Sequence, residues 1–209
     1  MSCRVEVIDH PIIRTRLTQL RSAETDSLHF RQALHDIAML MTHDITRDLE
    51  TDPVRVQTPL CETGGDRLSR PLVLIPILRA GIGLLNGFSS ILSEAAVGYI
   101  GLYRDEETLE PQCYYSKFPK HLAESDVILI DPMLATGNSS AEGASQLKAA
   151  GATRIRFACL IAAPAGIATF HDRHPDIPIF TAHIDEGLNE QAYIVPGLGD
   201  AGDRYFGTV

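Results

Sequence analysis

The segment from Val127 to Ser140 constrains the fold of this chain more than any other. It begins with four aliphatic residues, Val127 to Ile130, which is typical of a strand buried on both faces in a parallel sheet. Asp131 follows directly at the carboxyl end of that strand. Small residues come next, and a helical pattern runs from near Ala141 to Gly151, a residue that suits a left-handed cap. The segment therefore predicts a strand, a loop and a helix within an α/β fold.

The loop of small residues between this strand and this helix favours an anion site. The first N–H groups of a helix have no acceptor within the helix, and they lie at the positive end of its dipole. Together with the hydroxyls of Thr136 and Ser139 they would hold a phosphate. An ordinary turn with a serine cap is the alternative, because short motifs give many false positives. Asp131 favours the anion site, since a structural turn needs no carboxylate there.

A second strand-to-helix junction carries a cation. The apolar run from Leu72 to Leu78 predicts a buried strand, whose Pro76 should lie near its end or on a sheet edge. Arg79 follows, and then Gly81 and Gly83, so a guanidinium lies beside exposed amides. This arrangement suits a pyrophosphate. An arginine that binds loop carbonyls is the alternative interpretation.

The charged stretch from Tyr103 to Pro111 follows the predicted strand Val97 to Leu102. Such an excursion is often only a solvated loop. Its functional interpretation is a mobile arm, or hood, which folds over a ligand and brings Arg104 to a phosphate. Strands from Arg154 to Ile161 and from Ile179 to His183 complete the predicted sheet.

Two predicted helices precede the sheet. The first opens at His10-Pro11, and the second runs from about Leu28 to Leu49 with apolar residues at helical spacing. We expect residues 10–50 to pack on the core or in a dimer interface. Between these helices and the sheet, Val54 to Gln57 alternates like a half-exposed strand, and Cys61 to Leu68 is typical of a loop or hairpin tip.

The chain of 209 residues is predicted to form a single domain, residues 1–209. Its core would span residues 71–185. The last segment, residues 187–209, is rich in glycine but has enough apolar side chains to dock on that core. A docked backbone of this kind can approach a flat ligand closely.

The net charge of −9 argues against a nucleic-acid binder, which needs a basic face. It leaves room for a phosphorylated small molecule held by a few arginines, backbone amides and a divalent cation. The longest apolar run, residues 157–170, is too short to span a bilayer, and the amino-terminus has no signal-like apolar region. We therefore expect no membrane partner.

Neither the histidines nor the cysteines predict a metal site. We interpret His171 and His174 as solvent-facing at a helix end, because no third ligand lies at a recognisable spacing. The four cysteines are scattered without a close pair, so neither zinc nor a disulfide framework is implied. We therefore expect a cytoplasmic location.

The chain resembles the uracil phosphoribosyltransferase family over nearly its whole length from Pro11 onward. Four segments carry the resemblance: Pro76 to Gly83, Tyr103 to Pro111, Val127 to Ser139 and Tyr193 to Gly207. The most specific are Asp131-Pro132-Met133-Leu134-Ala135-Thr136-Gly137 and Pro196-Gly197-Leu198-Gly199-Asp200-Ala201-Gly202-Asp203. The resemblance implies a type I phosphoribosyltransferase fold, with a central, mostly parallel sheet flanked by helices. It also implies transfer of a phosphoribosyl group from phosphoribosyl pyrophosphate (PRPP) to uracil, which gives UMP and pyrophosphate. GTP is a candidate activator. We also expect a homo-oligomer, dimer or tetramer, because the helix from Leu28 to Leu49 has more apolar surface than one small domain needs.

The resemblance also assigns site residues. It implies catalytic roles for Arg79, Arg104, Asp131 and Asp200. It implies a uracil site formed by Ile194, Gly199, Asp200 and Ala201. PRPP would be bound by Arg79, Arg104, Asp131, Pro132, Met133, Leu134, Ala135, Thr136, Gly137, Asn138, Ser139 and Asp200. Mg²⁺ is the implied cofactor, held mainly by PRPP oxygens and water rather than by protein ligands.

Three positions depart from the family pattern. The family usually has glycine where Asn138 lies and aspartate where Asn86 lies, and His43-Asp44 replaces an aromatic-acidic pair. Asparagine tolerates a left-handed backbone, so the phosphate loop can keep its shape. Two other functions stay open. One is transfer to another base, such as xanthine or orotate, and the other is a non-catalytic nucleotide sensor.

Overall fold

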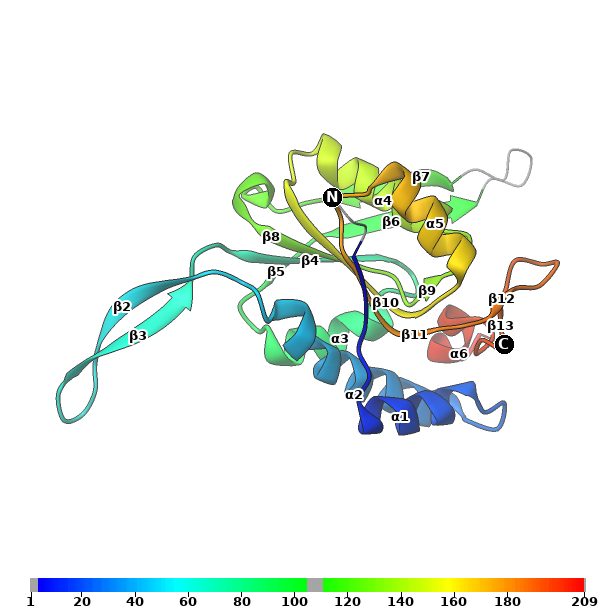
Figure 1. Cartoon of the computed structure of the whole chain (residues 1–209), viewed down its shortest axis with the longest axis horizontal. Coiled ribbons are helices and arrows are strands. Elements are labelled where there is room, and N and C mark those ends of the chain that lie inside the picture. The colour runs from blue at the N-terminus through cyan, green and yellow to red at the C-terminus, as the bar shows by residue number, and fades with distance from the viewer. Residues whose placement is uncertain (1–3, 105–110, 209) are drawn as a thin grey trace.

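A nine-stranded sheet forms the centre of the molecule, in the order β1-β11-β10-β8-β4-β6-β7 (Figure 1). The computed structural model describes residues 4–104 and 111–208, and the side chain of Arg104 lies outside that description. The strands on this path pair in parallel except for β6 with β7. Two short strands join it, β5 beside β4 and β9 beside β10. The strands are β1 (Val5–Val7), β4 (Leu72–Leu78), β5 (Ala96–Val97), β6 (Tyr99–Arg104), β7 (Pro111–Lys117), β8 (Asp126–Ile130), β9 (Met133–Leu134), β10 (Arg154–Ala162) and β11 (Ile179–Ile184).

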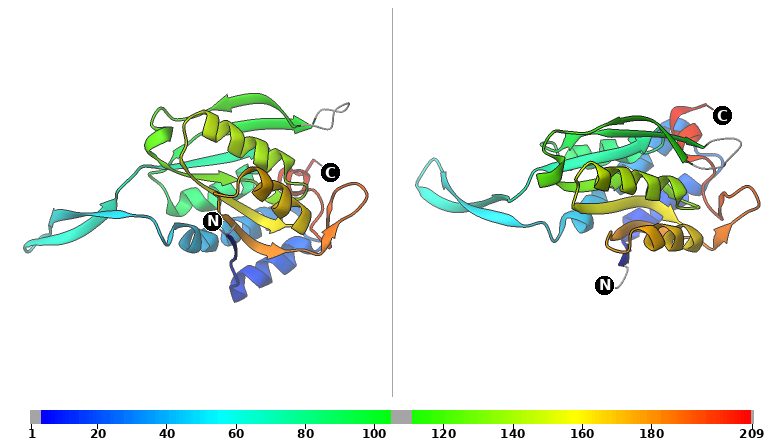
Figure 2. Two further views of the ribbon diagram at one scale, coloured as in Figure 1. Left: turned by 45° about the horizontal axis from the view of Figure 1, so that its top comes forward. Right: turned by 90° about the horizontal axis from the view of Figure 1, so that it is seen from above.

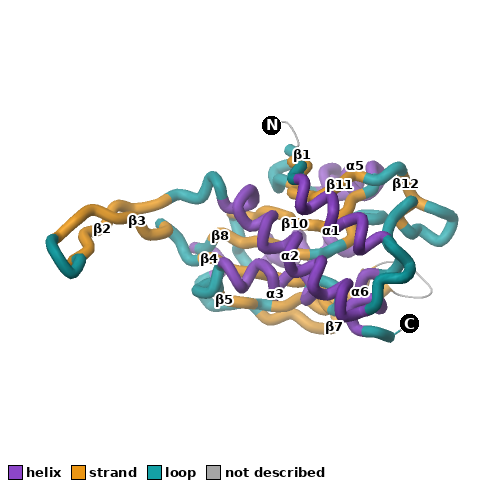
Figure 3. Tube along the Cα trace, turned by 90° about the horizontal axis from the view of Figure 1, so that it is seen from below, coloured by secondary structure: helices purple, strands orange, loops and turns teal. Residues whose placement is uncertain are grey.

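Helices cover both faces of this sheet (Figures 1 and 3). One face carries α1 (Pro11–Arg21), α2 (Ser27–Thr46) and α3 (Ile82–Ile91), with α6 (Ala201–Phe206) beside them. The other face carries α4 (Asn138–Ala149) and α5 (Pro164–Arg173). A single turn of 3-10 helix, Leu122–Glu124, precedes β8. This arrangement confirms the predicted α/β fold with a mostly parallel sheet.

Alternation along each strand divides the buried side chains between the two faces. Ile128 and Ile130 of β8 pack with α1, α2 and α3, whereas Val127 and Leu129 pack with α4 and α5. The five residues of β8 are all buried. The unbroken apolar run thus reflects a strand covered on both faces, as expected for parallel sheets.

The register of the three central strands aligns their ends. Leu72 of β4 and Arg154 of β10 both pair with Asp126 at the start of β8. Because the three strands run in parallel, their carboxyl ends meet at one edge of the sheet. Arg79, which follows β4, and Asp131, which follows β8, therefore lie at the same edge of the sheet.

The predicted N-terminal helices pack on the core. His10 Nδ1 accepts a hydrogen bond from the Ile12 N–H at the start of α1, and Asp26 caps α2 through the His29 N–H at 2.9 Å. The apolar residues of α2 are buried within the chain, from Phe30 to Ile45. Because its apolar face is already covered, α2 gives no support for a subunit interface.

A two-stranded hairpin projects from the body of the molecule (Figures 1 and 2). It consists of β2 (Thr51–Gln57) and β3 (Glu62–Leu68), paired antiparallel along their whole length. The prediction of a loop or tip over 61–68 is therefore wrong beyond Cys61. Gly64 and Gly65 have a low strand propensity, but they pair with Arg55 and Val54 of β2, whose sequence favours a strand.

Three further details differ from the sequence-based expectations. Pro76 is two residues from the end of β4, as expected, but β4 is an interior strand. On one side β4 pairs first with β5 and then with β6, and Pro76 lies between these two pairings. Helix α4 begins at Asn138, three residues earlier than predicted. The short edge strand β1 was not predicted, because three residues give too little pattern.

His171 and His174 are buried, so the prediction that they face solvent is wrong. They are only 8% and 5% exposed. The cause is the packing of α5 on α4, where His174 Nε2 lies 2.8 Å from the Ala141 carbonyl oxygen and 3.1 Å from Ser145 Oγ. Burial lowers the pKa of both imidazoles. Both rings therefore favour the neutral form.

Across the described ranges, none of the helices is both long enough and apolar enough to cross a membrane.

The close approach of α5 to the loop after β8 generates a first prediction. A Cβ on Gly166 would meet the backbone oxygens of Leu134, at 2.5 Å, and of Ala135. Gly166→Ala should therefore lower the free energy of unfolding by about 1 to 3 kcal/mol, since the backbone cannot yield without strain. Gly187→Ala is the matched control, because its Cβ would meet nothing within 4 Å. Urea unfolding of both variants checks this, and equal stabilities would contradict it.

Candidate active site

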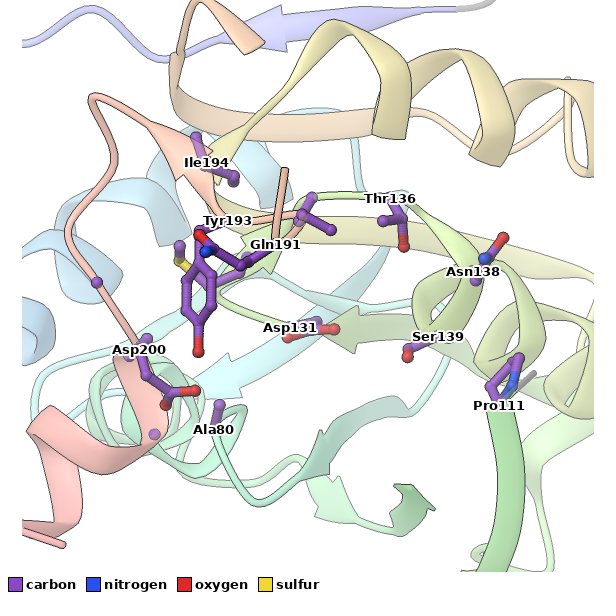
Figure 4. Close-up of a pocket in the computed structure, with 16 residues that line it drawn as sticks. Ala80, Pro111, Asp131, Thr136, Asn138, Ser139, Gln191, Tyr193, Ile194 and Asp200 are labelled. Atoms are coloured by element: carbon purple, nitrogen blue, oxygen red, sulfur yellow. The ribbon is translucent and has the colours of Figure 1, made fainter. Parts of the chain in front are cut away.

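A cavity of about 380 Å³ lies at the carboxyl ends of the central strands (Figure 4). Six parts of the chain contribute its walls: the loop after β4, the start of β7, the end of β8, the loop into α4, the β12–β13 hairpin and the start of α6. Here β12 is Gly187–Leu188 and β13 is Ile194–Val195. The lining residues are Ala80, Pro111, Asp131, Met133, Ala135, Thr136, Asn138, Ser139, Gln191, Ala192, Tyr193, Ile194, Gly199, Asp200, Ala201 and Gly202.

The loop into α4 has the geometry of an anion site. Gly137, with φ +85°, is the left-handed residue immediately before the helix, and α4 begins with Asn138 and Ser139. The first N–H groups of α4 and the Ser139 hydroxyl thus lie at the cavity. Asn138 is helical, so its departure from the family glycine needs no left-handed backbone. The expectation that asparagine must tolerate that conformation is corrected, because Gly137 adopts it instead.

Asp131 stands at the centre of the cavity (Figure 4). Its backbone N–H donates to the Ala158 carbonyl oxygen at 3.1 Å, which holds it against β10. Its carboxylate accepts a hydrogen bond from Ser140 Oγ at 3.3 Å. Burial outweighs this bond and the one from the Met133 N–H, and it raises the pKa of Asp131 to about 7. The carboxyl group can therefore change its charge near neutral pH.

Arg79 lies beside the cavity rather than among its lining residues. Its peptide bond with Leu78 is cis. Its guanidinium is 3.3 Å from Asp203 Oδ1 and 5.6 Å from the ring centre of Phe206, both on α6. Its side chain is 61% exposed, so solvent reaches it at this position. The backbone of Arg104 ends β6. Its side chain and residues 105–110 of the predicted hood lie outside the described residues.

The C-terminal segment is held in place by a buried ion pair. Asp185, whose side chain is fully buried, accepts hydrogen bonds from Arg21 at 2.5 and 2.9 Å and from the Gly197 N–H at 2.9 Å. Arg21 also donates to the Gly197 carbonyl oxygen at 2.8 Å. Arg204 adds bonds to the carbonyl oxygens of Leu198 and Ser22. The glycine-rich segment is therefore docked, as the sequence predicted.

Asp200 caps the short helix α6, where its carboxylate accepts a hydrogen bond from the Asp203 N–H at 2.8 Å. At the far side of α6, Asn86 Nδ2 donates to the Tyr205 hydroxyl at 2.8 Å. Asn86, where the family usually has aspartate, thus links α3 to α6 outside the cavity. His43 and Asp44 lie on α2 at the surface, where Asp44 pairs with Arg47.

Most of the site residues implied by the family resemblance surround one cavity, although their roles stay predictions. Pro132, Leu134 and Gly137 are buried behind the lining and shape the loop. Reasoning from the sequence missed six lining residues, which are Ala80, Pro111, Gln191, Ala192, Tyr193 and Gly202. Tyr193 carried a signal, since it begins the apolar run of the docked segment, but Gln191 carried none. Within residues 4–104 and 111–208, no group of three or more His, Cys, Asp or Glu is placed to hold a metal ion.

This fold and this cavity define a type I phosphoribosyltransferase. Adenine phosphoribosyltransferase from Trypanosoma brucei has the same fold, with a TM-score of 0.58 at 16% identity, over 94% of this chain and 87% of that one. The chain belongs to the uracil phosphoribosyltransferase family, whose model matches residues 7–208.

Similar proteins support this assignment. Uracil phosphoribosyltransferase of Paracoccus denitrificans is 52% identical over 203 residues, which are 97% of this chain and 96% of that protein. The protein of the same name from Legionella pneumophila is 50% identical over 206 residues, 98% of this chain and 96% of its own. The AQ2163 protein of Aquifex aeolicus superposes with a TM-score of 0.91 at 31% identity, with 97% of both chains covered.

The raised pKa of Asp131 generates a prediction about stability. The pKa is about 7 in the folded chain, against an ordinary value of 3.8, so between about pH 4 and 7 the folded state binds one more proton than the unfolded state. The free energy of unfolding therefore falls as pH rises through this window. Asp131→Asn removes this fall. The free energy of unfolding of the variant minus that of the wild type should therefore be about 2 kcal/mol more positive at pH 8 than at pH 5.

Urea unfolding at both pH values measures this difference. Asp176→Asn is the control, because Asp176 pairs with Lys148 and its pKa is lowered, so it stays ionised from pH 5 to 8. An Asp131→Asn effect of the same size at both pH values would show that Asp131 is ionised throughout.

Proposed function

We propose that this chain transfers the 5-phosphoribosyl group of PRPP to N1 of uracil, which gives UMP and pyrophosphate. One observation carries the proposal: an acid-ended strand and a phosphate-type loop share a single cavity with the backbone of the docked C-terminal segment. A ligand that bridges these parts needs a phosphate, a sugar and a flat base. The names of the relatives favour uracil as that base.

The proposed position of PRPP follows from the loop into α4. Its 5′-phosphate would bind at Ala135 to Ser139, where helix N–H groups and hydroxyls converge. The ribose hydroxyls would donate to the Asp131 carboxylate. This assignment explains why an acid stands beside an anion site, where it would otherwise repel the ligand.

The pyrophosphate would leave toward the arginines. Arg79 lies beside the cavity with an exposed guanidinium, and Arg104 ends β6 at the same edge of the sheet. Breaking the bond between C1 and pyrophosphate leaves an oxocarbenium-like ribosyl centre, so the reaction requires no nucleophilic side chain. Positioning of the reactants and stabilisation of the developing charge would supply the catalysis.

Mg²⁺ fits this site as a companion of PRPP. PRPP oxygens and water would be its main ligands, because phosphate oxygens are among the ligands that Mg²⁺ prefers, and the carboxylates of Asp131 and Asp200 lie close by on the cavity wall. When bound, the ion would neutralise part of the charge on pyrophosphate. Asp131 and Asp200 would orient the ribose and the base respectively.

Uracil would bind against the docked segment. Its edge presents an acceptor, a donor and an acceptor, which backbone N–H, C=O and N–H groups can match. Ile194, Gly199, Asp200 and Ala201 offer such groups at the cavity. Cytosine would set its amino group against a backbone donor and be rejected.

One assay tests this function, with purified protein, PRPP, Mg²⁺ and each base in turn. We expect UMP from uracil and no product from xanthine or orotate, and chelation of Mg²⁺ should suppress the product. Absence of UMP would reject the proposal, and product from another base alone would assign the chain to that base. No product from any base would favour a nucleotide sensor. GTP in a parallel reaction tests the predicted activation.

Arg79→Ala should lower kcat by about 10²- to 10³-fold, because it removes a group that stabilises charge in the transition state. Arg47→Ala is the control, since Arg47 is exposed at the end of α2, where it pairs with Asp44. Steady-state kinetics should show the control within twofold of the wild type. An Arg79→Ala variant with unchanged kcat would remove Arg79 from the catalytic machinery.

We also propose that the chain forms a homo-oligomer through the β2–β3 hairpin. An isolated two-stranded hairpin is marginally stable in water, and this one exposes Val56, Leu60 and Leu68. Light scattering should give a mass at least twice the 22.9 kDa of the chain. Leu60→Lys should weaken the assembly, whereas Leu28→Lys on α2 should leave it intact. A monomeric wild type would reject this proposal.

The proposed compartment is the cytoplasm. Cys61, Cys113 and Cys159 are free thiols, and disulfides are rare in that compartment.

A further inference from the structure

The cavity has one wall that the family motifs did not assign, the turn of the β12–β13 hairpin. Gln191, Ala192 and Tyr193 of this turn line the cavity. We propose that Asn189 is a positioning residue for the base, which holds this turn in the shape that the uracil end of the cavity requires. The inference rests on the proposed function, because it concerns the same site.

Asn189 is the centre of the hydrogen bonds within the turn. Its Oδ1 accepts from the N–H groups of Gln191, at 3.1 Å, and Tyr193, at 2.9 Å. Its Nδ2 donates to Gln191 Oε1 at 3.1 Å. Its backbone N–H donates to the Tyr193 carbonyl oxygen, and its own carbonyl oxygen accepts from the Ala192 N–H at 3.0 Å. One side chain thus binds both residues on either side of Ala192.

Ala192 has an unusual backbone. Its φ is +65°, and among the described residues it is the only one other than glycine with a positive φ. A residue with a Cβ adopts this conformation only where the surroundings enforce it. The bonds from Asn189 to the residues before and after Ala192 provide that enforcement. Without them, the turn would relax to a backbone that alanine prefers.

The strand pairing of the hairpin adds little to the hydrogen bonds of its turn. Its ladder has only two residue pairs, Gly187 with Val195 and Leu188 with Ile194. A two-stranded ladder of this size is not stable by itself. Ile194 is nevertheless anchored, since it is only 4% exposed. The segment between these anchors therefore depends on Asn189 for its order.

The position of the turn matters because of what it faces. Figure 4 shows the Tyr193 ring extending into the cavity toward Asp200, with Asp131 farther along the same space. Ile194 and Asp200 belong to the proposed base site, whereas the proposed phosphate loop lies at the opposite end. A displaced turn should therefore disturb binding of the base more than binding of PRPP.

The test compares three variants of the turn. Asn189→Ala removes every side-chain bond. Asn189→Asp keeps an acceptor for the N–H groups of Gln191 and Tyr193 but loses the donor to Gln191 Oε1. Glu190→Ala is the control, because this exposed residue lies in the same turn and makes none of these bonds.

Steady-state kinetics give the first measurement. Asn189→Ala should raise the KM for uracil by about three- to tenfold, the effect of losing one or two hydrogen bonds, and leave the KM for PRPP within about twofold. Asn189→Asp and Glu190→Ala should stay close to the wild type. The proposal is overturned if both KM values rise together, if neither changes, or if Asn189→Asp is as impaired as Asn189→Ala.

Amide hydrogen exchange in the protein without substrates gives the second measurement. The N–H groups of Gln191 and Tyr193 should exchange faster in Asn189→Ala and at the wild-type rate in Asn189→Asp. Unchanged exchange in Asn189→Ala would refute the positioning role whatever the enzyme does. Because this measurement needs no activity, faster exchange in a protein that forms no UMP would reject the proposed function and not the role of Asn189 in the turn.

Discussion

The register of β4, β8 and β10 is the constraint on which the site depends. Their first residues are paired at one level, so the loops that follow them leave the sheet at one edge. A shift of one residue would turn every side chain of β8 to the opposite face. Since β8 is buried on both sides, such a shift would exchange the side chains that pack in the two cores and disrupt the packing of both. The position of Asp131 is therefore as well determined as the core itself.

The surroundings of Asp131 supply positive potential, although the chain as a whole is negatively charged. A chain with a net charge of −9 proposed to bind a polyanion must supply local positive potential. Backbone N–H groups at the start of α4 and the guanidinium of Arg79 supply it here. Burial favours the neutral form of Asp131 and raises its pKa, which would reduce the repulsion between this carboxyl group and a bound anion. In the proposed complex the acid and the anion site are compatible, because they would engage different parts of one ligand.

The opposite wall depends on contacts between distant segments. Arg21 from α1 and Asp185 from the end of β11 form a buried pair that also binds both backbone groups of Gly197. Such a pair is stable only when its remaining hydrogen-bonding groups are satisfied, and Gly197 satisfies them. Arg204 then ties the segment to the connection between α1 and α2. The N-terminal helices therefore contribute to the site by holding the C-terminal segment in place.

The sequence by itself determined the elements with strong local patterns. Continuous apolar runs predicted β4, β8 and β10, an early proline predicted the start of α1, and small hydroxyl-bearing residues predicted the loop into α4, because these features depend on neighbours within a few residues. The resemblance to the uracil phosphoribosyltransferase family, carried most specifically by two motifs, implied most of the residues that line the cavity. Only the tertiary structure decided that His171 and His174 are buried, that 62–68 is a strand, and that Gln191 and Ala192 face the ligand cavity. The histidines depend on packing against another helix, the strand 62–68 on pairing with β2, and the turn on one side chain, Asn189, whose hydrogen bonds leave no periodic pattern in the sequence.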